Sequence, residues 1–483
     1  MLALCAAHPA YLAGLESALS DAQSAGGTAL VGGIGAPLAA MLRRNGEVAT
    51  TLDEHADIMA AVEGALSSGV VLGSAPVAQL LEDRGCDAVL PFKSGARLWT
   101  MAEWQHLRVL ASPHRLTPQL ENKLELAELA AAADARIPDT VTVHLDQALA
   151  DAAVTTGIAL PRVYQPAVGF AGAGTVLLET PEDVVRLVAD TPPKQAMGKL
   201  VEFVAGEPVT VNGVVIPPSV HGAGEDGEVL VGMVARQLTG LAGLTPTDFG
   251  SCGNDWAQPP SRDDVAAVRA LAHRIGEVLC QRGFAGAFGI DVVLPERGGV
   301  PVLIEINPRW TASLALQVEL QQRQGLPTLL DAHLAAFAYH PELRPSLGEL
   351  LAAFGPDHDA GCTRSVEPVS TILAYNATDM PVRIDDTFEP GVWRVTLSAT
   401  AGAAGPPTIE RVRDGWRLSD LDETDTSEVL LLPTGPGRDV EPGSYLVRII
   451  LRGASAATPL ARVLRPDVAA LALVVVTAAT SGN

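Results

Sequence analysis

The stretch G-F-A-G-A-F-G-I-D-V-V-L-P-E-R-G-G-V-P-V-L-I-E-I-N-P-R, residues 283–309, decides the fold of this chain. It contains two short apolar runs, 288–294 and 301–306, joined by the turn sequence P-E-R-G-G. This pattern predicts a β-hairpin in a buried sheet. Each run carries one acidic residue among its apolar neighbours, Asp291 in the first and Glu305 in the second. Because burying an isolated carboxylate is costly, the two acids indicate a functional site.

Further polar side chains follow at the end of the second run. Glu305 and Asn307 are two residues apart, so in a strand both side chains point to the same face. Two carboxylates and an amide oxygen from adjacent strands form a pocket that suits a hard cation such as Mg2+, particularly when phosphate oxygens complete the coordination. Arg309 adds a fixed positive charge. The alternative is a pair of acids at strand ends with local hydrogen bonds, and we favour the metal site because the residues occur as a set.

The patterns G-I-D-V-V-L and P-V-L-I-E-I-N-P-R resemble the metal-binding hairpin of the ATP-grasp superfamily. Most members of that family join a carboxylate to an amine or another nucleophile through an acyl phosphate. The resemblance implies that Asp291, Glu305 and Asn307 hold Mg2+, with Mn2+ as the alternative ion. It also implies that Arg309 is a catalytic residue that stabilises charge on the transferred phosphoryl group. Weaker motifs extend the resemblance back to about Lys123.

The resemblance assigns two phosphate-binding segments upstream of the hairpin. Lys123, in a helical run that starts near Glu121, matches a family lysine that reaches a nucleotide phosphate. The loop A-V-G-F-A-G-A-G, with Gly169, Gly172 and Gly174, matches the flexible lid over the triphosphate. Glycine amides can fold around phosphate oxygens without side chains in the way.

One position departs from the family pattern. Members commonly carry a second phosphate-binding lysine just before the lid, and here the matching residue is Gln165. A neutral amide donates hydrogen bonds to a phosphate but does not neutralise its charge. Lys199 and Arg236 are the nearest candidates by sequence for the missing cation.

The resemblance also places the adenosine part of the nucleotide. The backbone groups of Glu202, Phe203 and Val204 would pair with adenine at a hinge between two strands. Glu207 would hold the ribose hydroxyls, although the family usually has that acid one residue later, where this chain has Pro208.

The acceptor side carries no motif with a fixed chemical meaning. Arg236, Gln237 and Ser313 are candidates for a substrate pocket. The alternative for residues 214–262 is an ordinary strand meander, and for Ser313 it is a helix cap together with Thr311, which we favour.

The fold class is α/β (α+β), and the resemblance implies an ATP-grasp fold with additions at both ends. Residues 1–115 alternate apolar runs such as 29–31, 70–72 and 88–90 with helical segments such as 56–66. This alternation predicts an α/β layer with a parallel sheet. The expected domains are an N-terminal pre-ATP-grasp domain (1–115), an ATP-grasp domain (116–365, with its lid at about 140–203), and a β-rich C-terminal domain (366–483) that ends in a helix at about 465–478.

Composition limits the partners. The net charge of -23 argues against nucleic acid and anionic membranes, which clustered Lys and Arg bind. The five cysteines form no C-x-x-C pair, the N-terminus lacks a basic signal-peptide region, and the longest apolar run (468–479) is too short to span a bilayer. We therefore expect a cytoplasmic protein, with a homodimer as an open alternative. Lys93 and Arg97 follow a predicted strand, where anionic substrates are often held, but we favour surface cations.

These features predict an ATP-dependent ligase that couples a small-molecule carboxylate to an amine. Phosphoryl transfer requires mainly positioning and charge neutralisation, which agrees with the lack of a G-x-S-x-G or Walker A motif. Two alternatives remain: a carboxylase-type subunit that uses bicarbonate, and a nucleotide-binding protein without turnover, for which Gln165 is the best argument.

Overall fold

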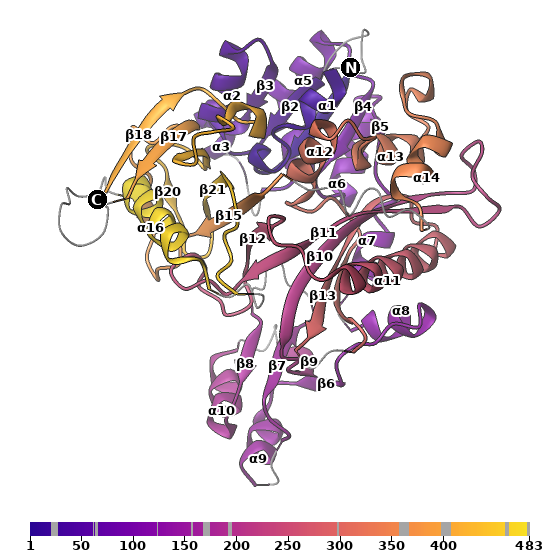
Figure 1. The fold of residues 1–483 in the computed structure, drawn as a ribbon, viewed down its shortest axis with the longest axis vertical. Helices are drawn as coiled ribbons and strands as arrows, with labels where there is room; N and C mark the ends of the chain where they lie inside the picture. Colours follow the sequence, from indigo (N-terminus) through magenta and orange to yellow (C-terminus); the bar gives the residue numbers. More distant parts are fainter. Residues whose placement is uncertain are drawn as a thin grey trace.

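The N-terminal part of the chain forms a parallel five-stranded sheet in the order β3-β2-β1-β4-β5. The computed structural model describes residues 1–20, 28–60, 62, 66–122, 124–155, 158–167, 174–191, 196–296, 299–356, 367–397, 407–458 and 463–480. The strands are β1 (Leu2–Ala6), β2 (Thr28–Gly32), β3 (Val48–Thr51), β4 (Ala88–Pro91) and β5 (Arg108–Val109). The helices are α1 (Leu15–Ser20), α2 (Ala36–Arg44), α3 (Ala56–Ala60), α4 (Ser68–Leu72), α5 (Ala75–Asp83) and α6 (Ala96–Trp104). The predicted parallel α/β layer is confirmed (Figure 1).

One predicted strand in this layer is wrong. Residues 70–72 belong to helix α4, whose N-cap Ser67 accepts a hydrogen bond from the Val70 amide (3.4 Å). A buried apolar run of three residues has the same composition in a strand and in a short helix, so the pattern could not separate them. Gly69 lets α4 approach α6, because a Cβ atom there would lie 2.7 Å from the backbone nitrogen of Leu98. The helix expected over 56–66 is shorter, since α3 ends at Ala60.

A ten-stranded sheet runs through the rest of the molecule in the order β14-β13-β10-β11-β12-β15-β21-β19-β17-β18. Its first half consists of β10 (Gly206–Ile216), β11 (Glu228–Thr239), β12 (Ser251–Asp255), β13 (Gly286–Pro295) and β14 (Val302–Asn307). Its second half consists of β15 (Val369–Tyr375), β17 (Gly391–Thr396), β18 (Thr408–Arg413), β19 (Glu428–Pro433) and β21 (Tyr445–Arg452). The C-terminal strands continue the central sheet because β15 pairs with β12, with Ile372 opposite Gly253. The predicted hairpin is β13 and β14.

Helices cover both faces of the first half of this sheet. On one face, α11 (Arg262–Gln281) and α8 (Leu126–Ala132) pack on Val209, Val211 and Ile290. On the other face lie α12 (Leu314–Arg323), α13 (Leu329–Ala336) and α14 (Leu347–Phe354), whose core continues into the N-terminal sheet. The buried residues of α11, such as Val268, Leu271 and Ile275, recur at helical spacing and form its apolar face.

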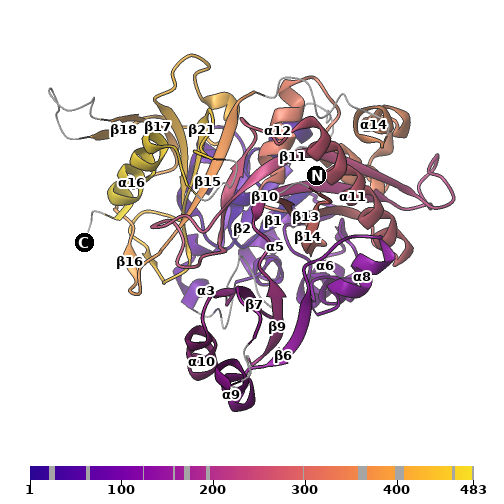
Figure 2. The same cartoon turned by 60° about the horizontal axis from the view of Figure 1, so that its bottom comes forward.

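The lid is a separate four-stranded antiparallel sheet in the order β6-β9-β7-β8, which projects at the bottom of Figure 1 and Figure 2. Its elements are β6 (Thr140–His144), α9 (Gln147–Thr155), β7 (Arg162–Pro166), β8 (Val176–Leu178), α10 (Pro181–Asp190) and β9 (Met197–Glu202). A small core of its own, which includes Tyr164 and Leu200, holds the helices on the sheet. The lid therefore meets the rest of the chain mainly through the strands that enter and leave it.

The long helix expected from Glu121 is broken into two short ones. α7 (Leu116–Leu120) ends before it, and α8 begins at Leu126. Between them the side-chain oxygen of Asn122 accepts a hydrogen bond from the Leu124 amide (3.0 Å), a local bond that competes with helical hydrogen bonding. Lys123 lies outside the described residues.

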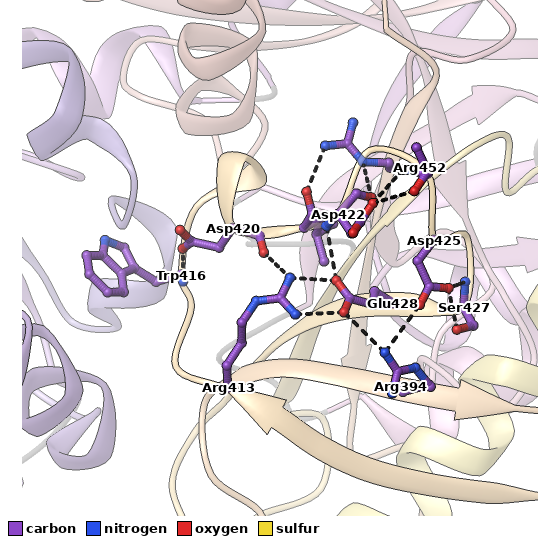
Figure 3. Close-up of polar contacts among 11 residues, drawn as sticks. Arg394, Arg413, Trp416, Asp420, Asp422, Asp425, Ser427, Glu428 and Arg452 are labelled. Atoms are coloured by element: carbon purple, nitrogen blue, oxygen red, sulfur yellow. Dashed lines mark hydrogen bonds and ion pairs between the residues drawn. The ribbon is translucent and has the colours of Figure 1, made fainter.

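Ion pairs hold the outer strands of the C-terminal part together. Glu428, buried on β19, accepts two hydrogen bonds from the Arg413 guanidinium (2.7 and 2.6 Å) and one from the Asp422 amide (3.0 Å). Figure 3 shows Arg394 approaching the same carboxylate. The two-residue strands β16 (Val382–Arg383) and β20 (Asp439–Val440) pair with each other in a separate two-stranded sheet. The expected terminal helix is α16 (Pro466–Thr480), which packs on the inner strands of this part.

Short 3-10 helices complete the described elements: Pro9–Tyr11, Leu52–Glu54, Pro341–Leu343 and Leu418–Asp420. No helix within the described ranges is both long enough and apolar enough to cross a lipid bilayer.

Candidate active site

The register of the β13–β14 hairpin brings the predicted metal-binding side chains together. Asp291 lies directly opposite Glu305, and Gly289 lies opposite Asn307. A β-bulge follows, because Val292 pairs with Leu303 and leaves Ile304 as the extra residue. Both acids and Asn307 line one cavity between the central sheet and the lid. The three oxygen-bearing side chains thus share a face, as their spacing predicts.

The carboxylates of Asp291 and Glu305 repel each other. Burial and the neighbouring Glu305 carboxylate raise the pKa of Asp291 to about 6, while hydrogen bonds from Thr210 and Gln237 partly oppose the rise. Thr210 stands opposite Asp291 on β10, so the carboxylate is flanked by both neighbouring strands. A pair of close carboxylates gains stability when a cation neutralises them. This pair is suited to a metal ion.

Arg309 is tied into the same cluster by three contacts. Its guanidinium donates to the Asn307 side-chain oxygen (2.8 Å), to the Trp310 carbonyl (3.1 Å) and to Glu121 (3.2 Å). The other oxygen of Glu121 pairs with Lys93 (2.9 Å). Glu121 therefore orients Arg309, and it links the metal-binding hairpin to a cation at the end of β4.

The donor set fits a hard divalent cation. Asp291 and Glu305 supply carboxylate oxygens, which Mg2+ prefers, and phosphate oxygens of a nucleotide would complete the coordination. The Asn307 amide directs its nitrogen to Asp291 (3.3 Å) and its oxygen to Arg309. For Asn307 to serve as a ligand, its amide must turn about the Cβ–Cγ bond.

The lid contributes a buried cation to the same cavity. Gln165 on β7 and Lys199 on β9 are direct cross-strand partners, and both line the cavity. Directly opposite residues in an antiparallel pair have Cβ atoms about 5 Å apart, so the two side chains reach nearly the same place. Lys199 is only 3% exposed. The positive charge missing at Gln165 is thus present on the adjacent strand. Gly174 lies outside the cavity lining, and Gly169 and Gly172 lie outside the described residues.

The three residues predicted to contact adenine lie between two strands. Glu202, Phe203 and Val204 line the cavity between β9 and β10. The Glu202 amide donates to the Asp139 carbonyl (2.8 Å), so this amide is already engaged within the protein.

Two predicted residues bind each other. Glu207 accepts a hydrogen bond from Arg236 (2.5 Å), which also donates to Gln258 (3.1 Å). Of the described residues that line the cavity, neither Glu207 nor Arg236 is one, whereas Pro208 and Gln237 are. This geometry makes Glu207 and Arg236 a structural pair between β10 and β11, and it does not support their expected contacts with ribose and substrate.

The helix-cap interpretation of Ser313 is wrong. Ser313 is the N-cap of α12, but its side chain makes no capping hydrogen bond. Its hydroxyl instead accepts from the Asn212 amide (3.0 Å) and exchanges a hydrogen bond with Thr311 (2.8 Å). Asn212 also donates to Gln317 (3.0 Å) and accepts from Thr311 (2.6 Å). This buried network fixes the segment that carries Arg309 onto β10.

Several cavity residues carry no sequence signal that could have identified them. Tyr11 and Phe92 come from the N-terminal layer, Phe249 from the loop before β12, and Tyr375 from the end of β15. Glu121, which is not part of the cavity lining, also carries no such signal, since it meets Arg309 across 188 positions in sequence. Only the fold brings these side chains together.

Comparisons with known proteins bear on the fold of the chain. Residues 120–313 match the family model described as the ATP-grasp domain. Biotin carboxylase from Campylobacter jejuni is similar in structure, with a TM-score of 0.55 at 12% identity over 94% of this chain and 87% of that chain. N5-carboxyaminoimidazole synthase from Aspergillus clavatus gives a TM-score of 0.52 at 12% identity over 94% and 93% of the two chains.

A third similar structure is phosphoribosylamine–glycine ligase from Thermotoga maritima, with a TM-score of 0.52 at 12% identity over 94% and 92% of the two chains. No protein of curated function matches the chain in sequence. At these identities the structural likeness shows the fold alone, and it confirms the fold class expected from the hairpin.

Proposed function

We propose that the chain is an ATP-dependent ligase, on the premise that residues 120–313, which match the model of the ATP-grasp domain, form such a domain. It activates a small-molecule carboxylate as an acyl phosphate and couples it to an amine. The observation that carries the proposal is the convergence of Asp291, Glu305 and Arg309 on a cavity that Lys199 enters from the lid. A phosphoryl-transfer site needs this combination of a metal-binding acid pair and fixed cations.

The proposed reaction balances in two steps. A carboxylate oxygen of the substrate attacks the γ-phosphorus of ATP, the bond to the β–γ bridging oxygen breaks, and ADP leaves. The amine then attacks the carbonyl carbon of the acyl phosphate, phosphate leaves, and the amine proton passes to solvent. The products are an amide, ADP and phosphate. No side chain forms a covalent intermediate, in agreement with a site that offers charge and position.

Each group in the cavity has a defined part in this proposal. Mg2+ held by Asp291 and Glu305, with Asn307 after its amide turns, would neutralise charge on the β and γ phosphates. Lys199 offers the lid's positive charge to the phosphates, in place of the lysine that Gln165 replaces. Arg309 lies beside the metal-binding residues, where it stabilises charge on the transferred phosphoryl group.

The test is the substitution Glu305→Ala, with Glu296→Ala as the matched control, because Glu296 is exposed at the turn of the same hairpin. ADP release in the presence of ATP, Mg2+ and a panel of amino acids and small peptides is the measurement. We expect Glu305→Ala to lower turnover by about a hundredfold or more, since one well-placed electrostatic group supplies that much catalysis. Circular dichroism should show the same fold in both variants.

Three outcomes would overturn the proposal. Near-normal ADP release by Glu305→Ala would remove the acid pair from the chemistry. ADP release by the unaltered chain that depends on bicarbonate and not on an amine would replace the amide ligase with a carboxylase. A chain that binds ATP but releases no ADP with any substrate would be a nucleotide-binding protein.

A further inference from the structure

A second cavity, of about 750 Å³, adjoins the one lined by Asp291, Glu305 and Lys199, which we call the nucleotide cavity. The two cavities share Tyr11, Phe92 and Tyr375 in their walls. A volume of this size lies within the range of about 300–1,000 Å³ that is typical of small-molecule sites. The proposed function assigns nothing to this space.

The second cavity lies at a position where α/β sheets bind ligands. The strand order β3-β2-β1-β4-β5 reverses direction between β1 and β4. The cavity is lined by Ala7 and His8 after β1, and by Phe92 and Lys93 after β4. In open parallel sheets, ligands bind at the carboxyl ends of the strands on either side of such a reversal.

The charge of the cavity is opposite to that of the molecule. Lys93 and Arg97 are its charged side chains, and among the described residues that line it there is no Asp or Glu. Within the described part of the chain, Arg97 makes no ion pair, although the protein has 56 acidic against 33 basic residues and a net charge of -23. Ser94 and the first turn of α6 lie beside these cations and add hydroxyl and amide donors. Such a surface recognises an oxyanion.

Aromatic rings form another part of the wall. Tyr11 stacks on Phe92, with ring centroids 5.0 Å apart and planes at 22°. The ring centroids of His8 and Tyr445 lie 5.5 Å apart. The buried Nδ1 atom of His8 has no hydrogen-bond partner in the described structure. Flat apolar walls with a few polar groups suit a ring-shaped or similarly flat ligand body.

The shared wall leads from this cavity to the candidate active site. The Arg309 guanidinium lies over the Phe92 ring, 5.9 Å from its centroid. On the polar side, Lys93, Glu121 and Arg309 form a continuous chain of ion pairs (2.9 and 3.2 Å) that ends at Asn307. A ligand anchored at Arg97 would therefore point its far end past Phe92 toward Arg309.

We propose that the second cavity binds one of the two substrates, a small molecule with a flat body and a terminal oxyanion. Arg97 and Lys93 hold the oxyanion, the aromatic wall holds the body, and the reacting group lies at the opposite end beside Arg309. The anchor is a carboxylate or a phosphate, two oxyanions that the same donors accept. The assignment rests on the proposed ligase function, and it adds the class of substrate.

Binding of simple probes tests the assignment without turnover. Calorimetry on the full chain would compare phenyl phosphate, 3-phenylpropionate and 2-phenylethylamine. We expect an oxyanion probe to bind more tightly than the amine, and the tighter of the two oxyanions identifies the anchor. Arg97→Ala should weaken that binding by about tenfold or more, the effect of losing one charge-assisted hydrogen bond. Arg84→Ala, an exposed arginine elsewhere in the same layer, is the matched control.

A second variant tests the space itself. An added Cβ at Gly95 would meet nothing within 4 Å, so Gly95→Phe should fold and place a ring in the cavity. It should abolish probe binding while ATP still binds. Equal binding of all three probes, or unchanged oxyanion binding in both Arg97→Ala and Gly95→Phe, would overturn the assignment. Glu305→Ala separates the two proposals, because it should retain probe binding whether or not the ligase function holds.

Discussion

At the scale of single residues, the proposed function depends on where positive charge meets the nucleotide. The lid strands place Lys199 directly opposite Gln165, so a cation on one strand can serve where the family pattern has it on the other. Both side chains are buried and line the nucleotide cavity. This placement weakens the argument that Gln165 marks a protein without turnover.

The pair permits an exchange experiment. Lys199→Gln should weaken ATP binding by about 10- to 100-fold, because hydrogen bonds to charged groups contribute about 1.5–3 kcal/mol. The double variant Gln165→Lys with Lys199→Gln should recover most of that loss, since the cation returns to the neighbouring strand. Calorimetry with ATP and Mg2+ measures both. Arg186→Gln, an exposed lid arginine, should bind as the unaltered chain does. Unchanged affinity in Lys199→Gln would contradict the assignment of the lid cation.

Some residues of the site could be predicted from the sequence and others could not. Asp291, Glu305 and Asn307 could be grouped from sequence because two adjacent strands fix their spacing. Glu121 could not be found, because its contact with Arg309 depends on how α7 meets the hairpin. Glu207 and Arg236 were expected at ribose and substrate, but the register of β10 and β11 directs them to each other.

At the scale of elements, the segment between β14 and α12 determines where Arg309 lies. A network centred on Asn212, which is 1% exposed, fastens this segment to β10 through Thr311, Ser313 and Gln317. Ser313 therefore positions this segment, which explains why its hydroxyl does not cap α12.

Removing the centre of that network should affect both stability and turnover. Asn212→Ala leaves buried polar groups without partners, which costs about 1–3 kcal/mol each. We expect a lower unfolding midpoint in urea and a larger loss in kcat than in ATP affinity, because Arg309 loses its fixed position. Gln79→Ala removes an exposed hydrogen bond on α5 and should change neither quantity measurably. A variant that keeps full kcat would show that the network does not position Arg309.

Elements were predictable where a pattern was long and local. The terminal helix α16 and the β13–β14 hairpin were expected nearly as found. Residues 70–72 of helix α4 were predicted as a strand, because a run of three buried residues is too short to show helical or strand periodicity. The bulge at Ile304, which follows the pairing of Glu305 with Asp291, has no signature in the sequence.

At the scale of the whole molecule, the N-terminal and C-terminal parts meet around α12. Glu16 of α1 accepts hydrogen bonds from the Trp416 indole (2.6 Å) and from Arg417 (3.0 Å). Glu319 of α12, which is 5% exposed, accepts from the Leu418 amide (2.6 Å). Burial is the main cause that raises the pKa of Glu319 to about 8. The contacts of Glu16 join parts about 400 residues apart, which sequence patterns do not reveal.

The raised pKa of Glu319 predicts a pH dependence of stability. The folded chain keeps the Glu319 proton up to about pH 8, whereas the unfolded chain releases it near 4.5. The contribution to stability is therefore full below about 4.5 and is lost as pH rises to 8, by at most about 1.4 kcal/mol per pH unit.

Thermal unfolding from pH 5 to 9 measures this dependence. Glu319→Gln keeps an acceptor for the Leu418 amide without the titrating proton, so its unfolding midpoint should fall less steeply with pH than that of the unaltered chain. Parallel curves for the two proteins would show that Glu319 is ionised in the folded chain at all of these pH values.

Both cavities lie where the N-terminal and C-terminal parts of the chain meet. Tyr11 from the N-terminal layer and Tyr375 from the C-terminal strands line the nucleotide cavity and the second cavity together. Because β15 extends the central sheet, this strand of the C-terminal part contributes Leu373 and Tyr375 to the wall of the nucleotide cavity.

A crystal structure of the chain with ADP and Mg2+ tests the central claim most directly. We expect one cation bound by oxygens of Asp291 and Glu305 at about 2.0–2.1 Å, with the diphosphate completing its coordination and Lys199 facing the phosphates. A nucleotide whose phosphates and cation lie away from both carboxylates would contradict the account.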